Sequence, residues 1–306
     1  MMKKQRLMAL VLSIAALGML TACAHSKDTT PAPAIQSAAD APASGALAYG
    51  QFAEGTTGLC ILADVGGITL QQGDNYALEG ENLIDEWFST EMQDGCLTIL
   101  YQPPSPEAVQ GIDTSAHHIT VTLPASHSIT RVELNAGTGT MAVSNLNCDS
   151  VLLSQGTGSM RIEELEADEL TIECGAGTVS GQGMIVTEKA VLQAGTGDIE
   201  LNGDFSGYLG LEGGTGTTVL RLTQPRESYD IRGESVVKNI LIDGKPLENS
   251  GDSWENWTPG EEIEWEGWNF GKEPASRHTA ASAGEDKHII EIDGGVGSVE
   301  IYFSVR

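Results

Sequence analysis

A Gly-x-Gly turn recurs along the middle of this chain at an almost constant interval, and this repeat limits the possible folds more than any other feature. The first glycines of five units are separated by 19, 19, 20 and 19 residues. A period of this length is typical of proteins built from stacked structural units. The glycines of the five turns are Gly137 and Gly139, Gly156 and Gly158, Gly175 and Gly177, Gly195 and Gly197, and Gly214 and Gly216.

Apolar residues also recur at fixed distances from each turn, in the alternating pattern of a strand with one buried face. Three residues before the first glycine stand Leu134, Leu153, Ile172, Leu192 and Leu211. Five residues before it stand Val132, Val151, Leu170, Ala190 and Leu209. Four residues after it stand Met141, Met160, Val179, Ile199 and Thr218. A second, shorter strand is therefore expected after each turn.

One such unit cannot bury its apolar face alone, but a stack of units encloses a core. The sequence therefore predicts an all-β fold, a β-solenoid (β-helix) with rungs of about 19 to 20 residues. The glycines suit its corners, where stacked backbones crowd one another or φ is positive. A β-sandwich of hairpins is the alternative, because the same period fits two strands and two turns.

The repeat has weaker continuations at both ends. Strand-like runs at 58–63, 67–70 and 94–101 are expected to start the coil, and 287–305 returns to the motif with Gly-Gly-Val-Gly. Residues 244–286 differ, because they are polar and rich in glycine and glutamate. They include Trp254, Trp257, Trp265 and Trp268. We expect an insertion that either caps the last rung or forms a binding surface, since indoles pack on cores and also anchor interfaces.

Several of these segments resemble a known family. Asp94-Gly95-Cys96-Leu97-Thr98-Ile99, the run 119–124 and the Gly-Thr-Gly units resemble the bacterial putative-adhesin family of β-strand-repeat lipoproteins, a domain of unknown function. The resemblance spans roughly residues 50–306. It implies a right-handed, single-stranded β-helical fold and supplies no catalytic residues.

The first residues of the chain have the pattern of an export leader. Lys3, Lys4 and Arg6 precede an apolar run of 14 residues from Leu7 to Leu20. At about 1.5 Å per residue this run is too short for a hydrocarbon core of about 30 Å. Leu20, Thr21 and Ala22 before Cys23 resemble a lipobox.

These patterns predict a domain order. We expect a signal peptide at 1–22, a lipidated Cys23 with an Ala/Pro/Ser tether over 23–46, and the solenoid over 47–306. The predicted location is extracytoplasmic and membrane-anchored, at the cell surface or in the periplasm. The alternative is secretion after cleavage at an ordinary small-residue site.

The charge of the chain excludes one class of partner. Without residues 1–22 it has 13 Lys and Arg against 43 Asp and Glu. Phosphate binding requires clustered cations, so nucleic acid is not an expected partner. We expect the protein to contact the membrane through its N-terminal lipid. An envelope protein or a glycan is the other candidate partner.

The residues that usually perform chemistry match no known site. Cys60, Cys96, Cys148 and Cys174 have no zinc-ligand spacing, and buried thiols are expected, with a Cys60–Cys96 disulfide as the alternative. The His117–His118 pair lies in a probable strand that sends its rings to opposite faces. Neither a hydrolase elbow nor a metalloprotease or phosphate-loop motif occurs.

The repeat also lacks the carboxylates of a calcium-binding β-roll. We therefore expect no cofactor, no metal and no catalysis. The expected function is that of a surface binding or scaffold module. A role as accessory protein in envelope stress or signalling and a polysaccharide-cleaving β-helix enzyme are the alternatives.

Overall fold

A computed structural model describes residues 46–47, 55–235, 240–247 and 287–304. The helices in these ranges are short 3-10 turns, and none is long and apolar enough to cross a membrane. The 3-10 turns are η1 (Asp85–Trp87), η2 (Pro106–Val109), η3 (Thr114–Ala116) and η4 (Arg226–Ser228). The strands are β1 (Ala46–Leu47), β2 (Gly58–Val65), β3 (Gly67–Gly73), β4 (Ala77–Glu81), β5 (Phe88–Gln93), β6 (Cys96–Tyr101), β7 (His118–Pro124), β8 (Ile129–Cys174), β9 (Thr178–Ala194), β10 (Asp198–Phe205), β11 (Tyr208–Glu212), β12 (Thr217–Leu222), β13 (Tyr229–Ser235), β14 (Ile240–Ile242), β15 (Lys245–Pro246), β16 (His288–Gly294) and β17 (Ser298–Phe303).

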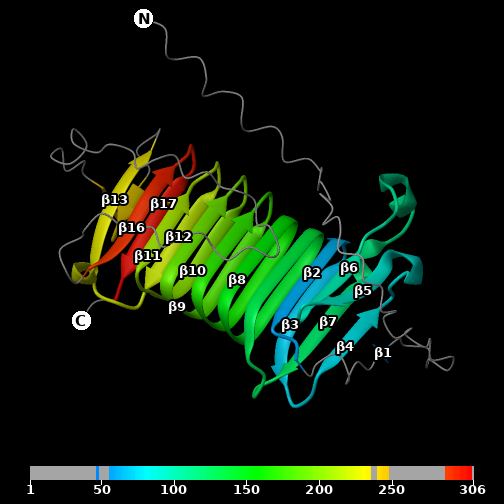
Figure 1. Cartoon of the computed structure of the whole chain (residues 1–306). Coiled ribbons are helices and arrows are strands. Elements are labelled where there is room, and N and C mark those ends of the chain that lie inside the picture. The colour runs from blue at the N-terminus through cyan, green and yellow to red at the C-terminus, as the bar shows by residue number, and fades with distance from the viewer. Residues whose placement is uncertain (1–45, 48–54, 236–239, 248–286, 305–306) are drawn as a thin grey trace, which may run out of the picture. The chain divides into compact units, whose positions relative to one another are not determined.

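The repeating units stack as parallel strands (Figure 1). β8 pairs with β9 so that Ile172 lies opposite Leu192, and β9 pairs with β11 so that Leu192 lies opposite Leu211. Residues at the same place in successive units are therefore neighbours. Hairpins would pair in antiparallel fashion, so the sandwich alternative is wrong and the predicted β-solenoid is confirmed.

The corner glycines form two columns along the stack. A Cβ on Gly156 would lie 2.4 Å from the carbonyl oxygen of Gly137, and one on Gly158 would lie 1.7 Å from that of Gly139. Of the ten predicted corner glycines, only Gly139 and Gly158 have φ in the left-handed region, at 151° and 134°. Glycine is therefore needed at most corners because adjacent backbones leave no room for a side chain.

The predicted inward positions form one continuous core. Leu134, Leu153 and Ile172 have no exposed surface. One inward position lacks an apolar side chain. Six residues after the first glycine, one unit has Gly181 where its neighbours have Ile162 and Leu201. A Cβ on Gly181 would lie 2.6 Å from Leu201 Cδ2 and 2.7 Å from Met184 Sδ, so neighbouring side chains already occupy that space. Gly181 stays in register, since it lies opposite Ile162 in one neighbouring rung and Leu201 in the other.

The order of the rungs at both ends differs from their order in the sequence. The predicted early runs do start the coil, but in exchanged order: the β2–β3 rung lies between β6–β7 and β8, so the run 94–101 contributes to the first rung and the runs 58–63 and 67–70 to the second. The β16–β17 rung lies between β11–β12 and β13–β14. The predicted return of the motif near the C-terminus is confirmed. Gly297 continues the glycine column, since its Cβ would lie 1.9 Å from the Gly216 carbonyl oxygen.

Antiparallel strands cover the edge of the first rung. β5 pairs with β6, β4 pairs with β7, and β1 pairs with β4. Such strands protect a sheet edge from pairing with another chain. In the described residues the last rung is covered only in part, because β14 pairs with the antiparallel β15 whereas β13 pairs only with β16.

Candidate functional site

The structure assigns packing roles to the two adjacent histidines. His117 is buried, and its Nδ1 lies 2.7 Å from the Tyr101 hydroxyl, in an aromatic cluster with Trp87. His118 Nε2 lies 2.8 Å from the Thr69 hydroxyl. The two rings therefore have separate partners in different surroundings. In the described part of the chain, no group of three or more His, Cys, Asp or Glu side chains is placed to hold a metal ion.

The four cysteines that the structure describes are free thiols. Cys60 lies opposite Thr98 on β6, whereas Cys96 lies opposite Gly58, so the alternative Cys60–Cys96 disulfide is not formed. Burial, with Glu133 and Cys96 as smaller causes, raises the pKa of the Cys60 thiol to about 12. Burial also raises the pKa of Cys148 to about 11. Thiols with raised pKa values are poor nucleophiles, because the thiolate is the reactive form.

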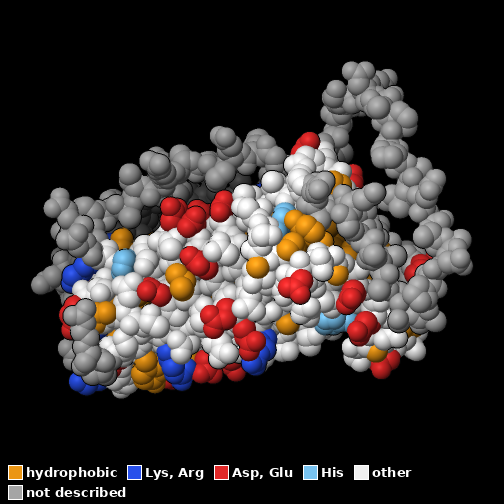
Figure 2. Space-filling model, turned by 90° about the horizontal axis from the view of Figure 1, so that it is seen from below, with side chains coloured by type: hydrophobic (Ala, Val, Ile, Leu, Met, Phe, Trp, Pro, Cys, Tyr) orange, Lys and Arg blue, Asp and Glu red, His pale blue; other side chains and the backbone are white. Residues whose placement is uncertain are grey.

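A row of acidic and amide side chains crosses the outer surface of the strands that precede the corners. We call Glu173, Gln193, Glu212 and Asp293 the acidic row. Each stands two residues before the first glycine of its unit, and each lies opposite the next in the parallel register. Neighbouring strands are about 4.8 Å apart, so the four side chains are close together. Figure 2 shows acidic side chains over much of the viewed face, with fewer basic ones.

The centre of the acidic row carries a perturbed carboxyl group. Gln193 Nε2 donates a hydrogen bond of 3.0 Å to Glu212 Oε2. Partial burial and the neighbouring Asp293 charge raise the pKa of Glu212, and the Gln193 hydrogen bond only partly offsets this rise. The unfavourable charge on this carboxyl would be relieved by a proton or by a cationic partner.

A second pair of polar groups lies beside the row. The Tyr208 hydroxyl donates a hydrogen bond of 3.1 Å to Glu291 Oε2 on β16. The Tyr208 ring lies over Gly210, whose Cβ would be 2.9 Å from a ring carbon. Burial, and then Glu291, raise the pKa of Tyr208, so its phenol stays protonated and can donate.

The acidic row has two possible chemical uses. Its charge and its oxygens suit a cationic or hydrogen-bond-donating partner. A pair of carboxyls with one raised pKa is also what a glycosidase uses, and Glu212 and Asp293 are such a pair. Neither carboxyl lines the two pockets that are formed by residues of 56–147.

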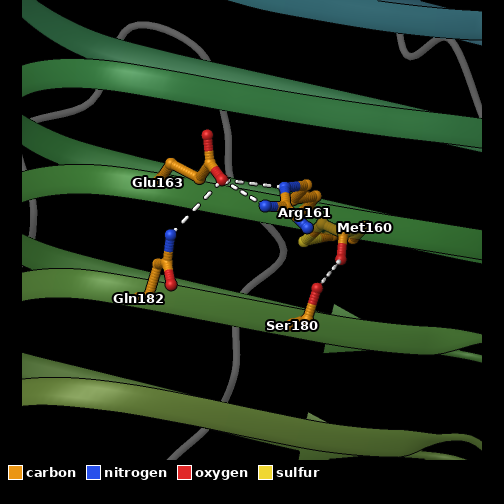
Figure 3. A network of polar contacts seen from close by, with 5 residues as sticks. All are labelled: Met160, Arg161, Glu163, Ser180 and Gln182. Carbon is orange, nitrogen blue, oxygen red and sulfur yellow. Dashed lines mark hydrogen bonds and ion pairs between the residues drawn. The ribbon is translucent and has the colours of Figure 1, made fainter.

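On the outer surface of the strands that follow the corners, unlike in the acidic row, acidic side chains are paired with basic ones. Glu163 accepts hydrogen bonds from Arg161 and from Gln182 on the next rung, while the Ser180 hydroxyl donates to the Met160 carbonyl (Figure 3). The Arg161 charge is thus neutralised by its neighbour on the same strand. Exposed ion pairs of this kind contribute little to stability, so this surface is a solvated face.

The acidic row was missed in the sequence, although its signal was present. Its members appear when the units are aligned on their glycines and the outward position two residues earlier is compared. Other predicted site residues lie outside the described residues. These are Leu20, Thr21, Ala22, Cys23, Trp254, Trp257, Trp265 and Trp268.

Two solved structures and one protein family are similar to this chain. A protein of Clostridium sporogenes described as a "putative cell adhesion protein" is 13% identical over 82% of this chain and 95% of its own, with a TM-score of 0.35. A "putative adhesin" of Bacteroides fragilis is 12% identical over 80% of this chain and 91% of its own, with a TM-score of 0.38. No curated protein matches. The Toastrack DUF4097 family matches residues 67–235, which is more than half of the chain, and the chain therefore belongs to this family of unknown function.

Proposed function

We propose that this protein is a membrane-anchored lipoprotein whose solenoid is an adhesin-like binding or scaffold module. The acidic row is the observation that carries the binding role. The row places carboxyl and amide groups in register on a backbone that is already ordered by stacking. Binding therefore costs little additional conformational entropy. The proposed partner is a cationic region of an envelope protein, because a net charge of −27 repels anionic polymers.

The acidic row can be tested by neutralising it without changing its shape. The double variant Glu212→Gln with Asp293→Asn is compared with Glu163→Gln plus Glu200→Gln, which removes two carboxylates from the other surface. Binding is measured by calorimetry with an oligolysine peptide as the probe at low and physiological salt. The proposal expects a marked loss of affinity only for the first variant. Equal losses in both variants would show that net charge alone attracts the peptide.

The proposed anchor depends on Cys23 and has its own experiment. Replacement of Cys23 by Ala removes the acylated thiol, so the variant should move from the membrane fraction to the soluble fraction of cells. Cys60→Ala is the matched control. Unchanged membrane fractionation of the Cys23 variant would contradict the anchor and leave the binding proposal intact.

Polysaccharide cleavage is the alternative function, because Glu212 and Asp293 lie side by side and the pKa of Glu212 is raised. We propose that the protein has no such activity. Purified envelope and plant polysaccharides are incubated with the protein, and new reducing ends are measured. Release that disappears in Glu212→Gln would establish an enzyme and overturn our proposal.

A further inference from the structure

The last rung ends in a strand whose edge is unprotected. In the described residues, β13 pairs with β16 on one side and with no strand on the other (Figure 1). The adjacent β14 is protected by β15, which consists of Lys245 and Pro246, two residue types that commonly block edge pairing. β13 contains neither lysine nor proline. An edge of this kind is a template for pairing with another chain.

The hydrogen-bond ladder shows which backbone groups of β13 face this edge. The N–H of Ile289 on β16 donates to the Gly207 carbonyl, on the β11 side. Backbone groups of successive strand residues point to alternate sides, so Ile290 faces β13, and Ile231 opposite it faces the edge. The edge-facing residues of β13 are therefore Tyr229, Ile231 and Gly233.

A side-chain contact agrees with this orientation. Arg226 Nη1 donates a hydrogen bond of 2.8 Å to the Tyr229 carbonyl, and Arg226 lies in η4, outside the β13–β16 ladder. The Tyr229 carbonyl therefore points away from β16. A carbonyl oxygen has two lone pairs, so this group can accept a further hydrogen bond.

The apolar core is incompletely covered at the same edge. Ile231 packs against the core but stays only partly buried, whereas Ile290 on the adjacent rung has no exposed surface. A further strand beside β13 would bury the exposed part of Ile231. Burial of apolar surface favours such an addition.

We propose that two copies of this chain pair through β13 in an antiparallel, two-fold arrangement centred on Ile231. Ile231 of each copy exchanges both backbone hydrogen bonds with Ile231 of the other. Tyr229 lies opposite Gly233 of the second copy. Asp230 lies opposite Arg232 of the second copy, in a pair without backbone hydrogen bonds, where side chains are closest.

The charges on β13 select this register. Asp230 and Arg232 already form an ion pair of 2.6 Å on one face of the strand, and the pairing gives each a second opposite charge. A register centred on Arg232 would place Asp230 opposite Glu234, and like charges in that position are destabilising. A register centred on Gly233 would place Asp230 beyond the end of the second copy's β13.

The local charge balance also permits the contact. The whole chain has 16 basic and 43 acidic residues, so two copies repel each other over most of their surfaces. The segment 226–247, which contains the last rung, has four basic and four acidic residues. Repulsion between two copies is therefore small where β13 meets β13.

Reciprocal charge reversal tests the pairing. The full-length Cys23→Ala chain is the parent, so that no acyl chain drives association. Sedimentation velocity from about 1 to 100 µM, where interfaces of modest area associate, should show a concentration-dependent dimer. Asp230→Lys and Arg232→Glu each place like charges opposite each other, so each alone should weaken the dimer at least roughly tenfold. An equimolar mixture of the two variants should restore it.

A matched ion pair provides the control. Arg161 and Glu163 also stand two residues apart on one strand, on an outer surface in the interior of the stack. Arg161→Glu and Glu163→Lys should therefore leave dimerisation unchanged. A parent that stays monomeric, as it would if residues 248–286 covered this edge, would overturn the proposal. So would dimers that both β13 variants retain, or a mixture that stays monomeric.

Cross-linking tests the register without relying on charge. Residues 230 and 232 of the two copies are expected at a Cα separation of about 4.5 Å, within the range of a disulfide. Asp230→Cys and Arg232→Cys chains are oxidised separately and as a mixture, and the parent gives the background from the native thiols. Linked dimers above that background should form only in the mixture. Equal cross-linking by either variant alone would contradict the two-fold register.

Discussion

At the scale of single residues, the corner glycines are constrained by backbone contacts and not by their own conformational preference. Gly214 illustrates this best, because its φ is not in the left-handed region and a methyl group there would lie 1.7 Å from the Gly195 carbonyl oxygen. The obstacle is backbone that is itself fixed by the next rung, so it cannot move aside as a flexible side chain would.

This contact leads to a prediction for Gly214→Ala. Overpacking against fixed backbone should lower the free energy of unfolding by roughly 3 kcal/mol or more, as measured by chemical denaturation. Thr215→Ala at the same corner is the matched control, because Thr215 is exposed, and it should change stability by less than about 0.5 kcal/mol. Similar stability of the two variants would contradict the crowding explanation.

The cysteines allow a second prediction at this scale. Cys96 is partly exposed, whereas Cys60 is buried with a pKa of about 12. In the native protein at pH 8, iodoacetamide should therefore modify Cys96 first, and modification should speed up as pH rises because the thiolate is the reactive form.

Mass spectrometry of tryptic peptides after timed labelling measures the order of modification. Labelling in denaturant is the control and should make all the thiols react alike. Equal rates for Cys60 and Cys96 in the native protein, or a disulfide between them, would contradict the structure.

At the scale of elements, the exchanged order of the end rungs has energetic consequences. In a simple solenoid the last rung contacts one neighbour, so its loss costs one interface. Here β16 and β17 are last in the sequence but interior in the stack, with β11–β12 on one side and β13–β14 on the other. Their removal breaks two interfaces.

Two deletions of similar length test this arrangement. Deletion of residues 151–169 removes one whole rung and joins Ser150 to Leu170, which takes the place of Val151. This variant should unfold in one cooperative transition, with a smaller denaturant dependence because it buries less surface. Deletion of 287–306 should remove cooperative unfolding. A cooperative transition in the second variant, seen by circular dichroism, would contradict the interior position of this rung.

The sequence could predict features that recur in every repeat unit, but not features that depend on pairing between distant strands. Positions such as Leu153 and Gly156 were predictable because each repeats a local alternation in every unit. The place of β16–β17 was not, because strand order depends on which edges pair, and no local pattern encodes that choice. Glu212 and Asp293 occupy the same outward position of the repeat, but only the pairing of the distant strands β11 and β16 makes them neighbours.

At the scale of the whole molecule, the dominant feature is an excess of negative charge on a stack of close strands. Of the ion pairs within the described ranges, Arg161–Glu163 and Arg221–Glu200 are largely exposed and contribute little. Glu212 and Asp293, in contrast, lie opposite each other across a strand spacing of about 4.8 Å. With 43 acidic and 16 basic side chains in the sequence, we expect repulsion to outweigh attraction in the folded state.

This balance predicts that salt stabilises the protein. Raising sodium chloride from about 10 mM to 150 mM shortens the Debye length from about 30 Å to 8 Å and screens the repulsion, so the melting temperature should rise. The double variant Glu212→Gln with Asp293→Asn should respond less, because it lacks two of the opposed carboxylates. A melting temperature that falls with salt would mean that the ion pairs, and not the repulsion, decide the stability of the solenoid.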